Sequence, residues 1–314
     1  MFPLSMPIAL RWFCALLLLF PVTIRAAESF LPGVKRILFL GDSITHSGTY
    51  VEYFEAHLLT RHPERKFEVI NAGLSSETVS GLSEDNHAGG KFPRPNLHER
   101  LDRALEKTRP DLVFACYGMN DGIYLPLDAE RFSKFQEGMI QLHQKAEAAG
   151  ARIIHITPPT FDPGPKAQPE AFNYNSVLDA YSEWLLAHRA KGWTVIDLHG
   201  PMNAELAQRR AQDTNFTFSR DRIHPDAAGH WIFTREILRG LNQPTEDFTL
   251  EPGFKELLPL VHEHVRTLGD AWLTEIGHRR PGVTEGLPLA EAREKAAKIE
   301  EQIRSLVTKG KPQP

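Results

Sequence analysis

The sequence has 314 residues, of which 41% are apolar and 9% aromatic, and its formal net charge is −4. A chain of this length can bury a full core as one large domain or two small ones. Its charge balance excludes the broad basic field that phosphate backbones demand, so we expect no nucleic-acid partner.

The N-terminus has the layout of a signal peptide. Arg11 precedes an apolar run over residues 12–22, and the small residues Ala26 and Ala27 follow. The apolar run falls well short of the roughly 20 residues that span a bilayer. We therefore expect a signal peptide over residues 1–27 and a secreted or periplasmic protein without a stable membrane anchor, an uncleaved anchor being the alternative.

The sequence contains two cysteines, and only Cys116 remains once a signal peptide containing Cys14 is removed. The mature chain would then form no internal disulfide, so its core must stabilise it. Cys116 lies in an apolar run, which favours a buried structural thiol over a reactive one.

Five short runs rich in apolar residues have the composition of buried strands. They cover residues 34–40, 67–71, 112–117, 152–157 and 194–198. Segments with helical spacing lie between and after them, notably residues 129–149, 172–191 and 227–238. This alternation predicts βαβ units and a parallel sheet covered by helices on both faces.

Polar residues gather where three of these runs end. The first ends in Gly41-Asp42-Ser43, the second in Asn71-Ala72-Gly73, and the third in Gly118-Met119-Asn120-Asp121. Parallel sheets bind ligands at the carboxyl ends of their strands, so we expect the functional site there. The segments 83–95 and 158–169 are predicted loops that shape the cleft, with ordinary surface connections as the alternative.

Beyond Gly240 the pattern becomes that of a helical extension. Apolar residues recur at three- and four-residue spacing over residues 254–272, and a second stripe follows over residues 289–306. The second stripe covers fewer than three heptads, so we expect it to pack on the preceding helix or on the α/β domain. A homodimer through the C-terminal helices is the alternative.

A serine hydroxyl becomes a nucleophile when a base takes its proton and donors await the developing oxyanion. Ser43 follows a strand and precedes a predicted helix, where it is a candidate nucleophile or, alternatively, a helix N-cap. Asp221 and His224 lie three residues apart, so one turn can place the carboxylate against the imidazole. A capping aspartate beside a surface histidine is the alternative.

Two further residues are candidate donors at the strand ends. Asn120 can point its amide N–H into the cleft, although a plain turn is the alternative. Gly73 offers a backbone N–H that a ligand can approach without a Cβ in the way.

These four blocks, Gly41-Asp42-Ser43, Gly73, Gly118-Met119-Asn120-Asp121 and Asp221-Arg222-Ile223-His224, resemble in order those of the SGNH (GDSL-type) hydrolases. The resemblance covers about residues 35–238, with Ile44 where the founding motif has leucine. It implies a three-layer α/β/α fold with a five-stranded parallel sheet of the flavodoxin-like type. We therefore expect an SGNH domain over residues 28–244 and a helical extension over 245–314.

The resemblance also implies the roles of single residues. Ser43 would be the nucleophile, His224 the base and Asp221 its partner. The backbone N–H groups of Ser43 and Gly73 and the side chain of Asn120 would form the oxyanion hole. No cofactor and no metal is implied.

The function implied is a serine esterase that works through an acyl-enzyme on a small-molecule or polysaccharide ester. Export and four aromatic residues near the strand ends, Tyr117, Tyr124, Phe216 and Phe218, favour O-acetylated carbohydrate as substrate. A lipid or thioester acylhydrolase is the alternative. An alternative of another class is a catalytically idle glycan-binding or scaffolding module.

The sequence offers little for other hydrolase designs. No Gly-x-Ser-x-Gly elbow surrounds Ser43, and no His-Glu-x-x-His helix is present. His262 and His264 are two residues apart and would lie on different faces of a helix, so we expect them to be solvated surface and not a metal site.

Overall fold

The computed structural model describes residues 30–165 and 172–309, and the predicted signal peptide over residues 1–27 lies outside them. The fold described below is that of the compact unit Gly33–Pro314, which contains both the sheet and the C-terminal helices.

The centre of this unit is a five-stranded parallel sheet in the order β2-β1-β3-β4-β5. Its strands are β1 (Arg36–Gly41), β2 (Glu68–Asn71), β3 (Leu112–Cys116), β4 (Arg152–Ile156) and β5 (Thr194–Ile196). Leu38 of β1 pairs with Ile70 of β2 and with Val113 of β3. The strands coincide with the five predicted runs to within two residues, which confirms the α/β fold class.

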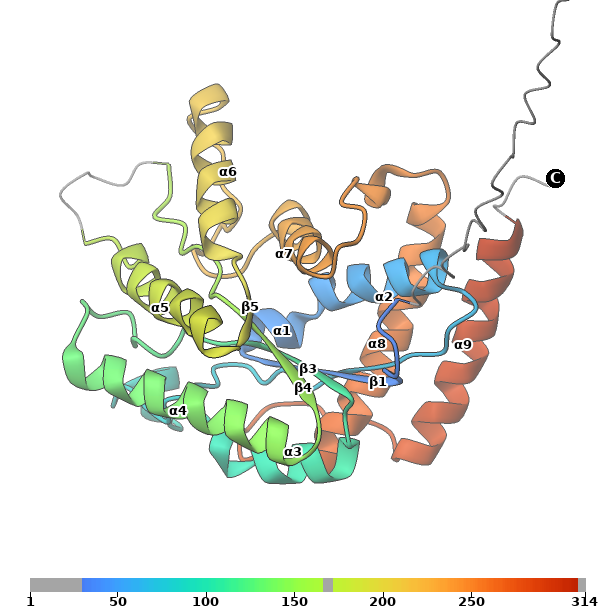
Figure 1. Cartoon of the computed structure of the whole chain (residues 1–314), viewed down its shortest axis with the longest axis horizontal. Coiled ribbons are helices and arrows are strands. Elements are labelled where there is room, and N and C mark those ends of the chain that lie inside the picture. The colour runs from blue at the N-terminus through green and yellow to red at the C-terminus, as the bar shows by residue number, and fades with distance from the viewer. Residues whose placement is uncertain (1–29, 166–171, 310–314) are drawn as a thin grey trace, which may run out of the picture. The chain divides into compact units, whose positions relative to one another are not determined.

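Helices bury both faces of the sheet. Successive strands are joined by helical crossovers, and such connections are almost always right-handed. Accordingly, α3 and α4 lie on one side of the sheet and α2 and α7 on the other (Figure 1). The helices are α1 (Ser43–Ser47), α2 (Thr49–Arg61), α3 (Leu101–Thr108), α4 (Ala129–Ala148), α5 (Asn175–Ala187), α6 (His199–Gln212) and α7 (Ala227–Gly240). Short 3-10 turns cover His87–Gly90, Leu97–Glu99, His188–Lys191 and Phe248–Leu250.

Continuous apolar runs are expected for strands that are covered on both faces, and the core has this character. Phe39 of β1, Phe54 of α2 and Phe114 of β3 are fully buried. The rings of Phe39 and Phe114 stack with centroids 4.9 Å apart, and Phe54 meets both rings edge-on. This aromatic cluster fixes α2 against the middle of the sheet.

Two long C-terminal helices, α8 (Phe254–Ile276) and α9 (Leu289–Lys309), extend the α/β core. Helix α8 runs beside the edge strand β2 and beside α2, and α9 packs against α8 (Figure 1). The stripe predicted on α9 is buried at Ala292, Ala296, Ile299 and Ile303. It packs within the chain, as expected for a stripe shorter than three heptads. Trp272 of α8 donates its indole N–H to Glu68 at 3.2 Å, so α8 also shields the edge of the sheet.

The expectation that His262 and His264 are solvated surface holds for His262, whose side chain is 57% exposed, and is wrong for His264. His264 is buried, and its Nδ1 lies 2.8 Å from Glu55 of α2, while His262 lies 2.8 Å from Glu52. Burial lowers the pKa of His264, but the Glu55 carboxylate outweighs it and raises the pKa above its usual value. Both histidines therefore serve the contact between α8 and α2. In residues 30–165 and 172–309 no group of three or more His, Cys, Asp or Glu side chains is placed to hold a metal ion.

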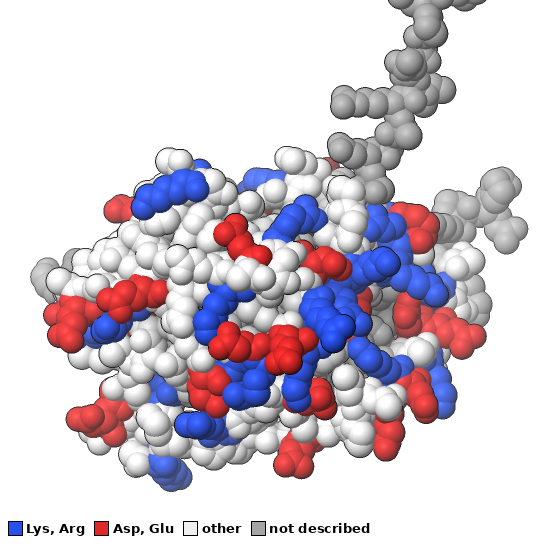
Figure 2. Space-filling model, turned by 60° about the horizontal axis from the view of Figure 1, so that its bottom comes forward, with Lys and Arg blue, Asp and Glu red and all other residues white. Residues whose placement is uncertain are grey.

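The surface carries charges of both signs. On the face shown in Figure 2, acidic and basic side chains are interspersed and separated by uncharged surface. None of the helices in the described part of the chain has the length and apolar character needed to cross a membrane.

Candidate active site

Ser43 lies at the sharp turn between β1 and α1. Asp42 caps α1, because its Oδ1 accepts the backbone N–H of Ile44 at 2.9 Å. Ser43 is thus the first residue of the helix and not its cap. A Cβ at Gly41 would stand 2.0 Å from Thr45 Oγ1, so only glycine lets the helix turn back this closely over the strand end.

Two buried carboxyl groups support this turn and the block at the end of β3. Burial raises the pKa of Asp42 to about 7, with the Ile44 N–H and His224 acting against it and Asp121 and Glu77 adding to it. Burial likewise raises the pKa of Asp121 to about 6. Asp121 Oδ1 accepts the N–H groups of Val79 and Ser80 at 2.9 and 2.8 Å, although its Oδ2 has no partner.

Ser43, His224 and Asp221 form a continuous hydrogen-bonded series. The Ser43 hydroxyl lies 2.7 Å from His224 Nε2, and His224 Nδ1 lies 2.6 Å from Asp221 Oδ2. A carboxylate can only accept, so the Nδ1 of a neutral imidazole must carry the hydrogen. Nε2 is then free to accept the serine proton, which is the arrangement that activates a hydroxyl.

The loop that carries Asp221 and His224 is held from several sides. Asp221 Oδ1 accepts the backbone N–H of His224 at 2.9 Å, and the intervening Arg222 adopts a left-handed conformation with φ +75°. The buried Asp162 accepts the Thr217 hydroxyl at 2.6 Å and the Phe218 N–H at 3.1 Å. The loop is therefore fixed at its base and in its middle, which presents the imidazole in one orientation.

Solvent reaches this series of side chains. The side chains of His224 and Asp221 are 45% and 56% exposed. Partial burial raises the pKa of Asp221, but the hydrogen bonds from the His224 side chain and from two backbone N–H groups outweigh it and hold the pKa below its usual value. Asp221 therefore remains ionised as an orienting carboxylate, in an open site.

Asn120 is buried at the end of β3, and its amide is held at both ends. Its Nδ2 donates to the Glu77 carbonyl at 3.1 Å, and its Oδ1 accepts the Tyr124 hydroxyl at 3.0 Å. The amide nitrogen carries two hydrogens, so one N–H remains for a ligand.

Gly73 lies at the end of β2, but its backbone N–H is already used. It donates to Asn71 Oδ1 at 3.0 Å, while Asn71 Nδ2 donates to the Thr45 carbonyl at 2.7 Å. A Cβ at Gly73 would stand 2.4 Å from the backbone nitrogen of His46. Glycine is thus required by the close approach of α1, and its N–H can serve an oxyanion only by sharing or leaving the bond to Asn71.

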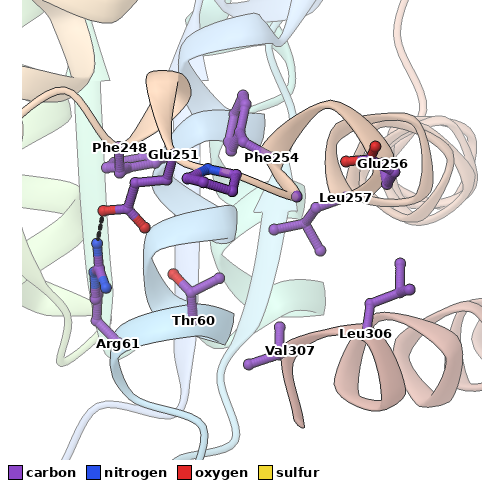
Figure 3. Close-up of a pocket in the computed structure, with 11 residues that line it drawn as sticks. Thr60, Arg61, Phe248, Glu251, Phe254, Glu256, Leu257, Leu306 and Val307 are labelled. Carbon is purple, nitrogen blue, oxygen red and sulfur yellow. Dashed lines mark hydrogen bonds and ion pairs between the residues drawn. The ribbon is translucent and has the colours of Figure 1, made fainter. Parts of the chain in front are cut away.

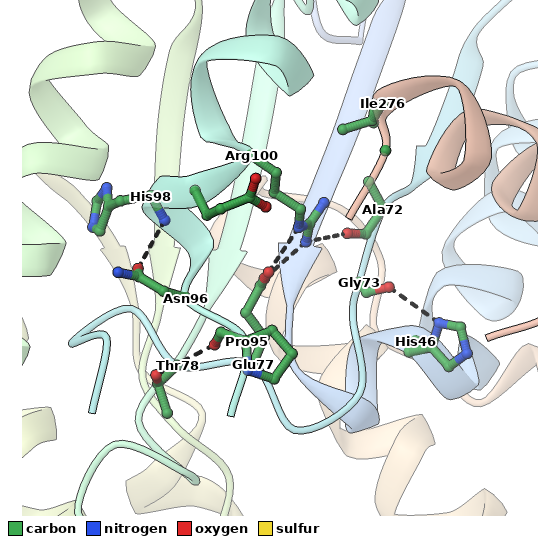
Figure 4. A network of polar contacts seen from close by, with 12 residues as sticks. His46, Ala72, Gly73, Glu77, Thr78, Pro95, Asn96, His98, Arg100 and Ile276 are labelled. Carbon is green, nitrogen blue, oxygen red and sulfur yellow. Dashed lines mark hydrogen bonds and ion pairs between the residues drawn. The ribbon is translucent and has the colours of Figure 1, made fainter. Parts of the chain in front are cut away.

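A buried ion pair lies behind both donor segments. Arg100 donates to the two carboxylate oxygens of Glu77 at 2.7 Å each, and its Nη2 also donates to the Ala72 carbonyl at 2.8 Å (Figure 4). The Tyr117 hydroxyl donates to Glu77 as well, at 2.7 Å. The same residue Glu77 receives the Asn120 amide on its backbone carbonyl, so this pair connects the segment of Gly73 to that of Asn120.

Of the four aromatic residues expected to stack on a substrate, the structure leaves two accessible. Tyr117 and Phe218 are each 1% exposed and cannot offer a ring face to a ligand. Tyr124 and Phe216 keep part of their surface accessible. Their rings are approached by the guanidinium groups of Arg94 and Arg209, at 5.6 and 5.2 Å from the centroids.

Glu77, Arg100 and Asp162 were not predicted from the sequence. Charged residues are almost never fully buried unless paired, and the residues near them in the sequence do not indicate a partner more than 20 residues away. Tyr124 was singled out for stacking, and its hydrogen bond to Asn120 could have been suspected only from its position four residues beyond that asparagine.

Two cavities in the described part are lined by residues other than the predicted triad. One, of about 440 Å³, lies between α2, the start of α8 and the end of α9, with Phe248, Leu257 and Leu306 among its lining residues (Figure 3). The other, of about 480 Å³, is lined by both charged and apolar residues, among them Glu77, Arg100 and Phe92.

Comparison with known proteins places this chain in a family. Residues 39–232 match the model of the GDSL-like lipase/acylhydrolase family. A curated acetylxylan esterase of Geobacillus stearothermophilus is 24% identical over 228 residues, which are 65% of this chain and 93% of that protein.

Solved structures agree in fold. A catalytic mutant of an acetylxylan esterase from Geobacillus stearothermophilus superposes with a TM-score of 0.52 at 23% identity, covering 67% of this chain and 95% of that one. An α/β hydrolase from the metagenome of Lake Arreo, Spain, has a TM-score of 0.52 at 24% identity, covering 66% and 95%. These findings confirm the resemblance seen in the sequence. The chain belongs to the GDSL-like lipase/acylhydrolase family and is a carboxylic ester hydrolase.

Proposed function

We propose that the protein hydrolyses O-acetyl esters of carbohydrates through an acyl-enzyme formed on Ser43. The observation that carries this proposal is the series from Ser43 Oγ through His224 to Asp221, with successive distances of 2.7 and 2.6 Å. In this reading Ser43 is the nucleophile, His224 the general base and acid, and Asp221 the carboxylate that orients the ring.

The reaction has two steps. In the first, Ser43 attacks the ester carbonyl while His224 takes the hydroxyl proton and then gives it to the departing alcohol. In the second, His224 activates a water molecule, which releases the acid and restores Ser43. The free amide N–H of Asn120 and the backbone N–H of Ser43 are the proposed donors to the oxyanion, with Gly73 joining when its bond to Asn71 is shared.

Protonation of the imidazole stops this sequence. A His224 ring that carries hydrogens on both nitrogens cannot accept from Ser43, so the reaction requires the neutral imidazole. Asp221 stays ionised beside it, because its pKa lies below the usual value for aspartate.

The choice of carbohydrate esters has two supports. The relative that aligns over most of its own length is named an acetylxylan esterase. In addition, the His224 and Asp221 side chains are about half exposed, and such an open site gives access to an acetyl group on a bulky polymer. The partly exposed rings of Tyr124 and Phe216 are the candidates for contact with a sugar.

The decisive experiment compares substrates. Acetate release from acetylated xylan and acetylated oligosaccharides is measured beside hydrolysis of p-nitrophenyl esters of increasing chain length, with Ser43→Ala as the control. We expect acetyl esters to be preferred and Ser43→Ala to lose several orders of magnitude in kcat. A preference for long acyl chains would instead support a lipid acylhydrolase, and near-native turnover by Ser43→Ala would end the assignment of the nucleophile.

We also propose that the protein is exported. The support is the apolar run over residues 12–22 behind Arg11, followed by small residues. Mass spectrometry of the protein from the periplasm or medium should find an N-terminus near residue 28. Full-length protein retained in the cell would contradict this proposal.

A further inference from the structure

The hydrogen bonds around Asn120 determine which way its amide faces. The Glu77 carbonyl can only accept, so the Asn120 nitrogen must face it. The amide oxygen then faces Tyr124, whose hydroxyl must donate. We propose that Tyr124 is a positioning residue of the oxyanion hole, which holds the Asn120 amide so that its free N–H points at the developing oxyanion. This inference rests on the proposed function, in which Asn120 is a donor.

The turn between Asn120 and Tyr124 is built to bring the hydroxyl back to the amide. Ile123 and Tyr124 both adopt left-handed backbone conformations, with φ of +46° and +57°. Such conformations are costly for residues with a Cβ, and they collect at sites where the surrounding structure enforces them. Gly122 allows the turn, because a Cβ there would stand 2.5 Å from the Tyr174 hydroxyl.

The ring of Tyr124 is fixed on several sides. Tyr174 packs against it with ring centroids 5.0 Å apart, and Phe161 lies at 6.3 Å. The Arg94 guanidinium lies 5.6 Å from the ring centroid and is itself held by a bidentate ion pair with Glu84 at 2.7 Å. The hydroxyl therefore has little freedom to leave the amide oxygen.

The contact has two consequences for catalysis. A donor on the amide oxygen prevents the amide from turning over, which would aim an oxygen at the oxyanion. It also polarises the amide and strengthens the N–H as a donor. Burial raises the pKa of the Tyr124 hydroxyl, so the group stays protonated and keeps donating at neutral and moderately alkaline pH.

Tyr124→Phe tests the role of the hydroxyl, because phenylalanine keeps the ring contacts and removes the oxygen. With p-nitrophenyl acetate we expect kcat to fall about 10-fold, with KM within about twofold and the melting temperature nearly unchanged. Affinity for phenylboronic acid, which forms a tetrahedral adduct with a serine, should weaken in parallel with kcat. Tyr53→Phe is the matched control, since Tyr53 is a buried tyrosine of α2 that packs against Phe254, and it should behave as wild type.

A double-mutant cycle tests whether Tyr124 acts through Asn120. In an Asn120→Ala background, Tyr124→Phe should cost no further activity, because the amide that it positions is gone. Equal losses in both backgrounds, or wild-type kcat in Tyr124→Phe, would overturn the inference. Ser43→Ala measured alongside separates the two proposals: an inactive Ser43→Ala beside an unaffected Tyr124→Phe removes only the positioning role, whereas an active Ser43→Ala removes the proposed function.

Discussion

Glu77 and Arg100 form a bidentate ion pair inside the fold, with both N···O distances 2.7 Å and both side chains at most 1% exposed. The pair links two chain segments of the candidate site, because Arg100 also holds the Ala72 carbonyl and Glu77 also receives the Asn120 amide. Burial raises the pKa of Glu77, an effect that Arg100 and the Tyr117 hydroxyl oppose. The pair is therefore stable only while both partners are present.

Arg100→Met should destabilise the protein by about 3–5 kcal/mol, because it leaves the Glu77 carboxylate buried without its counter-charge. Urea unfolding followed by circular dichroism measures the change. A double Arg100→Met and Glu77→Met variant should recover much of the loss, since it removes both charges. Lys134→Met breaks an exposed ion pair with Glu137 at 2.8 Å and should leave the unfolding midpoint unchanged. Equal midpoints for Arg100→Met and Lys134→Met would contradict this prediction.

Asp42→Asn should stabilise the protein, and more strongly at high pH. The pKa of Asp42 rises from 3.8 to about 7 on folding. Burial of this carboxyl therefore costs no unfolding free energy below about pH 4, and the cost grows as the pH rises toward 7. An asparagine keeps the cap on the Ile44 N–H but cannot ionise. We expect the gain in unfolding free energy to be about 2–3 kcal/mol larger at pH 8 than at pH 5.

Urea titrations of both proteins at the two pH values give this difference directly. Thr45→Ser, a change at the same turn without a titratable group, serves as the control for local disturbance. A gain for Asp42→Asn that is the same at pH 5 and pH 8 would mean that ionisation of this carboxyl is not its cause.

The fold could be predicted from the sequence because its signals are local. The run in β3 is apolar along its whole length and that in β1 is apolar from Ile37 to Leu40, so their position follows from composition alone. The four site blocks meet because the first three end or follow parallel strands and the fourth stands before α7. Chain order and strand direction suffice for that much.

The supports of the site could not be predicted, because each depends on a partner far along the chain. In the sequence, Arg100 and Glu77 look like ordinary surface charges, and only the fold brings them together as a buried pair. His264 was expected on the surface from its two-residue spacing to His262. That spacing could not reveal that α2 packs on α8 and supplies Glu55 as a partner. The N–H of Gly73 was expected to face a ligand, but it donates to the side chain of Asn71, two residues before it.

Gly138→Ala should destabilise the protein, although alanine normally stabilises a helix interior by about 1 kcal/mol relative to glycine. A Cβ at Gly138 of α4 would stand 2.1 Å from the Val79 carbonyl oxygen, so helix or loop must shift. The Val79 N–H donates to Asp121 beside Asn120, so kcat should fall as well. Ser133→Ala on the exposed side of the same helix is the control and should be neutral or stabilising. A melting temperature of Gly138→Ala above that of wild type would contradict the predicted clash.

Asp221→Asn should lower kcat by about 10²- to 10⁴-fold while the protein stays folded. The carboxylate accepts from His224 Nδ1 and thereby leaves Nε2 free to accept from Ser43. An asparagine amide that turns its N–H toward Nδ1 favours the opposite tautomer, in which Nε2 carries the hydrogen and cannot take the serine proton. The backbone N–H groups of Ile223 and His224 that now bind Asp221 Oδ1 can still bind the amide oxygen, so the loop should keep its shape. Steady-state kinetics beside a thermal melt measure both effects, and a variant with wild-type kcat would show that His224 does not depend on Asp221 for its orientation.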